Sequence, residues 1–490
     1  MKRKAFELWL LLLLSASTLM LAEYSLVSGS NSVENQPSNA DYEVLTIYIR
    51  SDGSVEGTDL IERIGNVYTF KGNIGTFNQT ITANTYLGGI VVERDNIIID
   101  GAGYNLTGSG HYGSISPFGD PPIKIHTPGI ATTGRSNVVI KNLTVQHFLY
   151  GILLQGSTNI TVLNSVLRSE QGISAYNSEQ LTLVNCKIYD PGYGSGYGVH
   201  LQNTMRCLIY NNTFTNIRYG IHGGHGSNGI YSDHNVIANN QFIRNDYAIQ
   251  MGASSYNIFL NNIIQNGSYW LPEYDIWLPG EGIYIGGEGN IFCGNHISGN
   301  KFAIKTGGND NLFYGNTIAD NDFGVVLYGS KANVTFYGNN FFNNENDVQA
   351  INQYNFPTEY DVLGFVFLDN GSVGNYWSKY NGSDWNWDGV GDTLYNLRSE
   401  ILTGSFSFIS EEADVAFGVD NFPLMSPVAL SGAFDDLPLW AIEKLASMGL
   451  LEDSATQSDM LPAVMIAAVS AASAGIIAVG LLVYFKKRKR

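Results

Sequence analysis

One repeating unit through the middle of the chain constrains the fold more than any other feature. Aligned at one key position, usually asparagine, nine units read VVIKNLTV, ITVLNSVL, LTLVNCKI, CLIYNNTF, VIANNQFI, IFLNNIIQ, IFCGNHIS, LFYGNTIA and TFYGNNFF. Each has an apolar residue two positions before the key position and another three positions after it. The shortest steps between units are 21 to 23 residues. Most units then add a short strand led by Gly or Ala, such as GILL, GVHL or AIQM.

Self-similarity at this period, with strand-like spacing and no helical periodicity, indicates a solenoid. We predict an all-β fold, a right-handed parallel β-helix over residues 42–344, with coils stacked about 4.8 Å apart. The recurring apolar residues would stack inside the tube. Asparagine suits the corner because it tolerates the left-handed conformation and because stacked amides hydrogen-bond along the solenoid. Residues 90–108 fit an opening coil.

Both ends of the chain predict export and anchoring. Residues 1–29 begin with three basic residues and continue with an apolar run, the pattern of a signal peptide, with an uncleaved anchor as the alternative. Residues 30–41 look like a flexible leader. Residues 461–485 carry no charge, long enough for a transmembrane helix, and the basic tail 486–490 should stay in the cytoplasm. We therefore expect a single-pass type I membrane protein whose ectodomain is extracellular or pseudoperiplasmic.

Charge is distributed unevenly along the chain. The formal net charge is −18, and residues 345–459 hold 19 Asp and Glu against three Lys and Arg. Nucleic acid and anionic membrane surfaces are therefore excluded as favoured partners, whereas cations fit. We interpret 345–428 as an acidic cap on the solenoid and 429–459 as a juxtamembrane segment. Within the latter, residues 436–452 predict a short amphipathic helix that rests on lipid headgroups or on the cap through Leu437, Trp440, Leu445 and Met448.

The acidic cap contains a candidate calcium loop. Oxygen-bearing residues occupy positions 1, 3, 5, 7 and 9 of an EF-hand-like loop, with Gly389 at position 6, where the chain must bend sharply. The predicted ligands are Asp384, Asn386, Asp388, the carbonyl of Val390, and Asp392. Position 12 is Tyr395 rather than glutamate, so modest affinity is expected, and a polar turn is the alternative. Trp377, Trp385 and Trp387 are expected to pack this cap against the last coils.

Three coils carry insertions, at 190–198, 222–233 and 266–282. The first and third leave the same predicted corner and could wall one side of a groove. The third combines flat rings with carboxylates, a combination that suits sugar binding, and its candidate ligand-binding residues are Tyr269, Trp270, Glu273, Tyr274, Asp275 and Trp277. An aromatic loop folded onto the solenoid wall is the alternative.

Histidines supply a second candidate metal site. His200 and His222 occupy equivalent outward positions on successive coils, so their side chains should lie about 5 Å apart. His225 and His234 follow within the next insertion. Imidazoles at this spacing could share copper or zinc, and solvated histidines are the alternative. The three cysteines, Cys186, Cys207 and Cys293, define no disulfide framework.

The repeats, the entry turn IIIDGAGYNLTG and the ending GNYWSKYNGSDWNWDGVGDTLYN followed by VDNFPLM resemble the NosD-type β-helix proteins. Many of these are exported archaeal surface proteins, and the family name implies periplasmic copper handling. β-Helix polygalacturonases also resemble this fold. Here GGHG (223–226) matches one of their motifs, but QNTMR (202–206) lacks the expected aspartate, and Lys305 lacks the neighbouring arginine. No complete lyase or hydrolase site can be assembled.

We therefore expect a membrane-anchored surface protein that binds glycans or cell-surface polymers, with a polysaccharide or a surface glycoprotein as its partner. A copper-handling protein, a polysaccharide lyase or hydrolase, and a structural envelope protein remain as alternatives.

Overall fold

The computed structural model describes residues 43–75, 85–108, 128–189, 196–223, 231–271, 276–328, 333–352, 366–400, 402–403, 414–428 and 437–448. Apart from Glu43, they belong to one compact unit that begins at Val44. The predicted signal peptide, leader, transmembrane helix and basic tail lie outside these residues. No helix within the described part of the chain is long and apolar enough to cross a bilayer.

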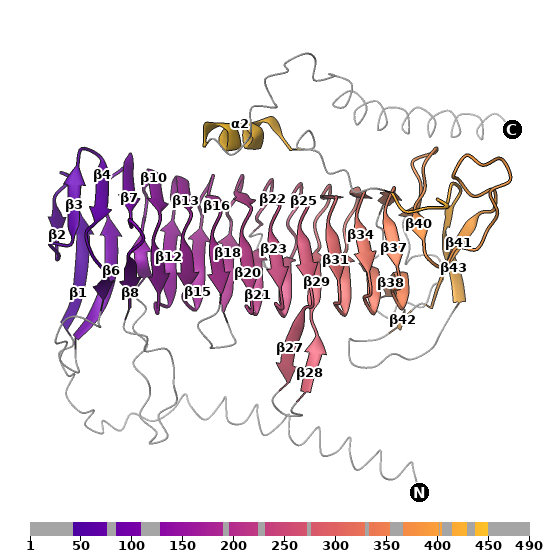
Figure 1. Cartoon of the computed structure of the whole chain (residues 1–490), viewed down its shortest axis with the longest axis horizontal. Coiled ribbons are helices and arrows are strands. Elements are labelled where there is room, and N and C mark those ends of the chain that lie inside the picture. Colours follow the sequence, from indigo (N-terminus) through magenta and orange to yellow (C-terminus); the bar gives the residue numbers. More distant parts are fainter. Residues whose placement is uncertain are drawn as a thin grey trace, which may run out of the picture. The chain divides into compact units, whose positions relative to one another are not determined.

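Three long sheets build this unit, and we name them A, B and C (Figure 1). Sheet A has 14 strands, in the order β2 (Val55–Glu56), β1 (Glu43–Ile49), β6 (Thr85–Val92), β9 (Pro128–Ala131), β12 (Tyr150–Gln155), β15 (Gln171–Tyr176), β18 (Tyr197–Gln202), β21 (Tyr219–Gly223), β24 (Tyr247–Met251), β29 (Glu281–Ile285), β32 (Phe302–Thr306), β35 (Phe323–Tyr328), β38 (Asn346–Asn352) and β42 (Leu402–Thr403).

Sheet B has 13 strands, β3 (Ile61–Ile64), β4 (Val67–Phe70), β7 (Ile97–Asp100), β10 (Ser136–Lys141), β13 (Thr158–Leu163), β16 (Thr182–Val184), β19 (Leu208–Tyr210), β22 (Val236–Ala238), β25 (Ile258–Leu260), β30 (Ile291–Cys293), β33 (Asn311–Tyr314), β36 (Val334–Tyr337) and β39 (Val366–Phe367). Sheet C has 12 strands, β5 (Ile74–Gly75), β8 (Asn105–Thr107), β11 (Thr144–Gln146), β14 (Val166–Arg168), β17 (Lys187–Tyr189), β20 (Thr213–Thr215), β23 (Gln241–Ile243), β26 (Ile263–Gln265), β31 (His296–Ser298), β34 (Thr317–Ala319), β37 (Asn340–Phe342) and β40 (Tyr376–Trp377).

The chain visits sheets A, B and C in turn. The first strands form the antiparallel pairs β1–β2 and β3–β4. From β4 onward, strands pair in parallel with their counterparts one coil along, as in β18 with β21 and β19 with β22. This confirms the predicted parallel β-helix. The parallel sheets extend past residue 344, because β38, β39 and β40 add a further coil. Among the described residues, two antiparallel pairs and one helix lie outside the three long sheets. They are β27 (Ser268–Leu271) with β28 (Ile276–Pro279), β41 (Tyr395–Glu400) with β43 (Asp414–Asp420), and α2 (Leu439–Ser447).

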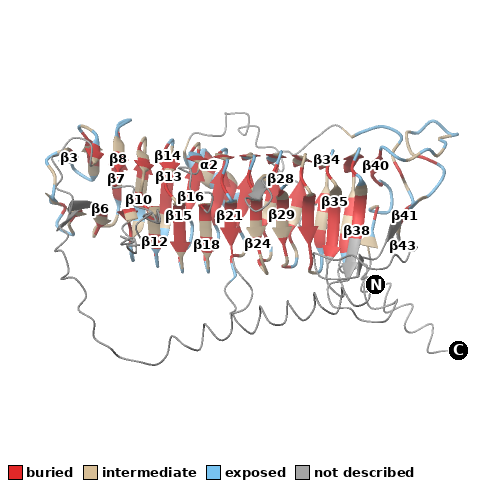
Figure 2. Ribbon diagram, turned by 90° about the horizontal axis from the view of Figure 1, so that it is seen from below, coloured by how far each residue is buried: buried red, intermediate tan, exposed pale blue. Residues whose placement is uncertain are grey.

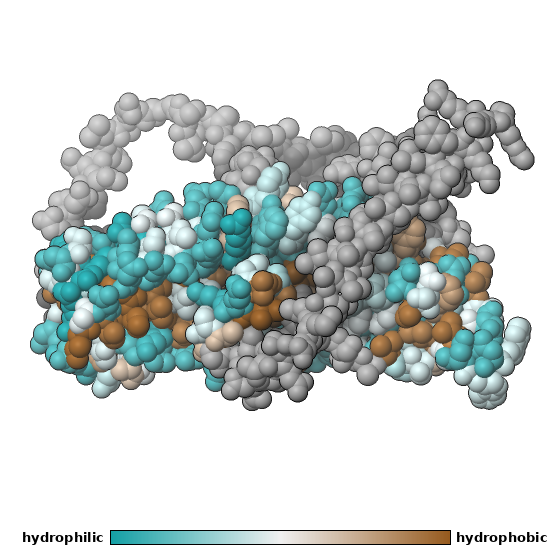
Figure 3. Space-filling model, turned by 90° about the horizontal axis from the view of Figure 1, so that it is seen from above, coloured by the Kyte–Doolittle hydropathy of each residue, from teal (hydrophilic) through white to brown (hydrophobic). Residues whose placement is uncertain are grey.

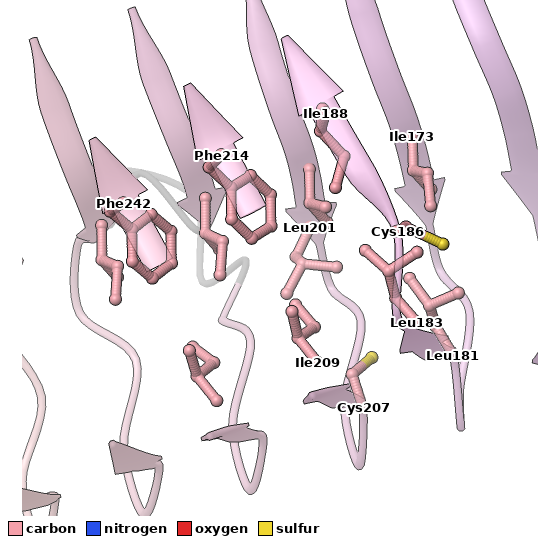
Figure 4. Packing of buried hydrophobic residues seen from close by; sticks show 14 of the residues in the cluster. Ile173, Leu181, Leu183, Cys186, Ile188, Leu201, Cys207, Ile209, Phe214 and Phe242 are labelled. Carbon is pink, nitrogen blue, oxygen red and sulfur yellow. The ribbon is translucent and has the colours of Figure 1, made fainter. Parts of the chain in front are cut away.

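The core consists of apolar side chains stacked on their counterparts in adjacent coils (Figure 4). Figure 2 shows that buried positions recur in successive strands. Both recurring apolar positions predicted from the repeat are buried, from Ile140 and Val145 to Phe336 and Phe341. Ring centroids in the file of Phe292, Phe313 and Phe336 lie 4.3 and 4.6 Å apart. All three cysteines are buried and form no disulfide, and burial raises the pKa of the Cys186 and Cys207 thiols to about 12.

A left-handed corner residue follows the strands of sheet B from β10 to β36, and from β19 onward the residue after this corner is a buried asparagine. The key position of the repeat has positive φ, 51° at Asn261 and 63° at Gly294, as the prediction for asparagine requires. The residue after it forms the buried ladder, which runs through Asn212, Asn240, Asn262, Asn295, Asn316, Asn339 and Asn375. Each amide nitrogen in this ladder lies 2.9–3.1 Å from the next side-chain oxygen.

Helix α2 lies on the outer face of sheet B. Leu437, Ala441 and Leu445 are buried in a second apolar cluster together with Val184, Leu208, Tyr210, Val236, Ala238, Leu260 and Cys293. The Lys444 ammonium donates a hydrogen bond of 2.9 Å to the Asn159 side chain. The predicted amphipathic helix is therefore present, and its apolar side packs on the solenoid wall instead of on headgroups or the cap. Figure 3, viewed from above Figure 1, shows further hydrophobic patches among polar residues.

Replacing one rung of the buried ladder should destabilise the solenoid. Asn295→Ala removes the partner of the Asn262 amide and leaves the Phe259 carbonyl without its side-chain donor. We expect a loss of about 2–4 kcal/mol, measured as a lower urea midpoint. The control is Asn261→Gly at the left-handed corner, where glycine already occurs one coil on at Gly294, and where we expect a change below about 1 kcal/mol. Equal effects of the two substitutions would contradict a structural role for the ladder.

An aspartate on the buried side of α2 should release the helix from sheet B. Leu445→Asp places a carboxylate against the apolar cluster and should cost about 3 kcal/mol or more, enough to undock α2. Hydrogen exchange of the α2 amides should then accelerate strongly while exchange of the sheet amides stays unchanged. Leu439→Asp is the matched control, because Leu439 is 62% exposed on the same helix and its exchange should stay close to wild type.

Candidate functional site

The outer face of sheet A carries a file of stacked tyrosines. Tyr197, Tyr219 and Tyr247 occupy the same register position on β18, β21 and β24. Their ring centroids lie 5.1 and 4.9 Å apart with interplanar angles of 16° and 12°. Because the rings cover one another's faces, the file presents ring edges and phenol hydroxyls outward. This tyrosine file repeats a hydrogen-bonding group over three successive coils.

The next outward position on the same strands holds His200, His222 and Gln250. The two imidazole centroids lie 5.1 Å apart, in agreement with the spacing expected from the repeat. Tyr197 contacts both rings, at centroid distances of 5.0 and 4.9 Å. The tyrosine file and these three residues form one continuous surface, which we call the sheet A face.

Burial keeps the sheet A face uncharged. It lowers the pKa of His200 to about 4, so this imidazole is neutral at physiological pH. The Tyr176 hydroxyl lies 3.4 Å from His200 Nδ1, and burial raises the pKa of Tyr176 and of Tyr219. The buried side-chain oxygen of Gln250 finds no hydrogen-bond partner among the described residues. The face therefore offers neutral hydrogen-bonding groups.

The face continues toward the C-terminus with a charged pair. Glu281 follows Tyr247 in register, and Lys305 lies one coil further, with its ammonium 4.0 Å from the Glu281 carboxylate. The Lys305 ammonium also lies 5.0 Å from the Tyr284 ring centroid. Burial is the main cause that raises the pKa of Glu281 and lowers that of Lys305. The opposite charges of Glu281 and Lys305 neutralise each other, and the pair marks the C-terminal end of the neutral surface.

One of the predicted insertions is described. The β27–β28 hairpin stands between β26 and β29 and leaves the edge of sheet A next to sheet C. Residues 190–195 and 224–230, from the other two insertions, lie outside the described residues. In the hairpin, Trp270 is the register partner of Trp277 and Tyr269 that of Leu278. The predicted ligands Glu273, Tyr274 and Asp275 lie outside the described residues, and the sugar-binding role of this hairpin stays a prediction.

The histidine set is only partly assembled. His225 lies outside the described residues. His234 has a left-handed backbone, φ 58°, and stacks on Tyr256 at 5.2 Å, in the connection before β22. Within the part of the chain that is described, no group of three or more His, Cys, Asp or Glu side chains is placed to hold a metal ion. The structure thus joins His200 and His222 without a third ligand from the described residues.

The candidate calcium loop is folded by its own side chains. Asp384 accepts the backbone N–H groups of Trp387 (2.7 Å) and Gly389 (3.0 Å), while Asp388 accepts that of Val390 (2.8 Å). Asn386 accepts the Asp388 N–H. These bonds are made by predicted ligand side chains, and calcium at Asp384, Asn386, Asp388, Val390 and Asp392 stays a prediction.

The tryptophans near this loop divide into two groups. Trp377 is buried, stacks on Phe341 at 4.4 Å and donates its indole N–H to Asp420, as a residue packed on the last coils should. The expectation for Trp385 and Trp387 is wrong, because they are 76% and 89% exposed. The loop holds its own backbone in place, so it needs no tryptophan packing against the coils. The capping role of residues 345–428 stays a prediction.

Sequence reasoning missed the tyrosine file. It began each strand of sheet A at the small residue, as in GVHL, and so left out the tyrosine before it, although YG or YA recurs at residues 150, 197, 219 and 247. The small residue is needed because a Cβ at Gly220 would lie 2.5 Å from the Ala248 carbonyl oxygen and 2.8 Å from the Phe242 ring. The recurring dipeptide was the available signal.

Two family models match the chain. A right-handed β-helix region covers residues 128–269, and a model described as periplasmic copper-binding protein (NosD) covers residues 215–382. The chain is a parallel β-helix protein that is similar to NosD over residues 215–382. For copper, the described residues of this NosD-like chain offer the His200–His222 pair and no third ligand beside it, so they do not make a fitting site and we derive no copper chemistry from them.

None of the curated proteins compared with this NosD-like chain matches it significantly. Solved structures with a similar fold include the periplasmic alginate epimerase AlgG (14% identity, TM-score 0.35, 66% of this chain and 78% of that one). Others are the catalytic domain of a GH87 α-1,3-glucanase (12%, 0.34, 71% and 71%) and the Streptococcus pneumoniae surface protein and adhesin PfbA (14%, 0.33, 61% and 77%). At these scores the structures carry no argument about function.

The buried imidazole of His200 should make the fold acid-sensitive. The pKa of His200 is lowered from its ordinary value of 6.5 to about 4 in the folded protein. Between these two pH values the imidazole is protonated in the unfolded chain and neutral in the folded protein. Stability should fall as pH drops from 6.5 to about 4, by up to about 3 kcal/mol from this group. Urea midpoints of wild type and His200→Phe at pH 7 and pH 4.5 test this. An equally steep decline in the variant would show that His200 is not responsible.

Proposed function

We propose that the protein binds a neutral, hydroxyl-rich polymer, a glycan, along the sheet A face. The observation that carries this proposal is the file of Tyr197, Tyr219 and Tyr247, stacked at about 5 Å beside His200 and His222. A polymer laid along the solenoid axis would meet the same hydroxyl at each coil. The rise per residue of an extended pyranose chain is close to this spacing, so successive sugars can make equivalent contacts.

The electrostatics of the face favour a neutral ligand over an ion. The low pKa of His200 and the raised pKa values of Tyr176 and Tyr219 leave uncharged donors and acceptors there. A phenol hydroxyl and a neutral imidazole each donate and accept, which suits sugar hydroxyls that do both.

The setting of the face supports access by a long ligand. The β27–β28 hairpin leaves the edge of sheet A next to sheet C, and the sheet continues past the face in both axial directions. The cellular location belongs to the same proposal: residues 461–485 and the basic tail 486–490 would anchor the protein in a membrane with the solenoid outside the cell.

The test removes the hydroxyls and keeps the rings. In the triple variant Tyr197→Phe, Tyr219→Phe, Tyr247→Phe the stack is retained and three hydrogen-bonding groups are lost. We expect at least a tenfold loss of affinity for the neutral polysaccharides that wild type binds, since each lost bond contributes about 0.5–1.5 kcal/mol. Affinity gel electrophoresis against a panel of neutral glucans, mannans and galactans measures it.

The matched control is Tyr314→Phe, Tyr337→Phe. These tyrosines stack at 5.4 Å in the same manner, but they lie on the outer face of sheet B. We expect the control variant to bind like wild type. If the sheet A variant also binds like wild type, or if wild type binds none of the panel, the proposal fails.

A further inference from the structure

Two tryptophans expose their indole rings from the loop 383–392. Trp385 and Trp387 are 76% and 89% exposed, which makes them the most exposed large hydrophobic side chains in the described part of the chain. Trp377, less than ten residues earlier, is 1% exposed. The segment can therefore bury a tryptophan where packing requires one. Large apolar side chains left in water are unfavourable for the folded state, and paired ones mark interaction sites.

The loop is built to hold these two residues in place. The N–H of Trp385 is bound by the Asp392 carboxylate at 2.5 Å, and that of Trp387 by Asp384 at 2.7 Å. The base of the loop is fixed because the Gly391 N–H donates to the Pro423 carbonyl and the Met425 N–H to the Gly389 carbonyl. A rigid platform loses little conformational entropy when a ligand binds.

Trp387 also has an unfavourable backbone conformation. Its φ is 61°, in the left-handed region that bulky residues rarely adopt. Neither the exposed ring nor the backbone angle gains packing inside the protein. Backbone strain of this kind is retained at binding sites, where it holds a side chain in the position that binding requires.

We propose that Trp385 and Trp387 form a second saccharide contact, a platform on which neutral pyranose rings pack. The apolar C–H face of a pyranose fits the flat face of an indole, and the neighbouring Asn386 and Asp388 side chains can meet its hydroxyls. This inference rests on the proposed function for its ligand class. It adds a site outside the sheet A face, at the C-terminal end of the solenoid.

The negative charge of the loop favours a neutral saccharide over an anionic ligand of the two exposed tryptophans. The loop contains Asp384, Asp388 and Asp392, and no Lys or Arg occurs from residue 380 to residue 397. An anionic lipid surface or a uronate polymer would be repelled by this group of carboxylates. Neutral sugars are not repelled.

The experiment follows tryptophan emission of the full chain, with EDTA present so that bound cations do not contribute. The probes are the same neutral glucans, mannans and galactans, polygalacturonate, and vesicles of phosphatidylcholine with and without phosphatidylserine. We expect a neutral polysaccharide to shift or quench the emission, and polygalacturonate and vesicles to leave it unchanged. In Trp385→Ala, Trp387→Ala the response should disappear and affinity should fall about tenfold or more. Leu394→Ala, which removes a 52% exposed apolar residue of the same segment, is the control and should behave like wild type.

The two saccharide sites are separated by comparing variants. If the tyrosine triple variant keeps the emission response while losing affinity, both proposals stand. If the tryptophan variant binds like wild type and the tyrosine variant does not, the platform is refuted and the sheet A face is retained. If the response survives in the tyrosine variant without any loss of affinity, the proposed function fails and the platform stands. A response to vesicles or to polygalacturonate alone, or no response to any probe, overturns the platform.

Discussion

Registration of each coil on the next is the interaction on which the rest of the structure depends. The buried amides from Asn212 to Asn375 fix it, because each accepts and donates hydrogen bonds along the axis at about 3 Å. A coil that slipped by one residue would leave these amides unpaired in an apolar interior, at a cost of about 1–3 kcal/mol for each group. The ladder thus enforces the parallel register that stacks Phe292, Phe313 and Phe336 inside the tube.

The same registration organises the outside. A residue type repeated at one position of the sequence becomes a continuous file on the surface, and each sheet uses this differently. On sheet B, outward Leu208, Val236 and Leu260 make an apolar wall that needs a cover, and α2 provides it. On sheet A, outward tyrosines and histidines make a polar file bordered by insertions. The outer face of sheet B is thereby covered by the protein's own helix, while the outer face of sheet A leaves its repeated polar groups at the surface.

The inner half of this architecture is predictable from the sequence. Inward positions must be apolar in every coil, so the residues from Ile140 to Phe341 show the period without any structure. Outward positions carry no such requirement, so their pattern is weaker. The tyrosine file was missed because the glycine was taken as the first residue of the strand. Helix α2 could be predicted as a helix, but its docking surface could not. The spacing of residues in the sequence does not show that seven residues on the outer side of sheet B form one apolar cluster.

The exposure of Trp385 and Trp387 follows from how the acidic loop is stabilised. A loop that packed its tryptophans on the coils would gain stability from burial, which is how Trp377 and Leu397 contribute. This loop instead uses carboxylates, with Asp384 binding two backbone N–H groups and Asp392 a third. Because the fold of the loop is secured by polar bonds, its aromatic rings are free to serve a partner. The same logic applies on sheet A, where coil stacking orders the tyrosines and leaves their hydroxyls outward.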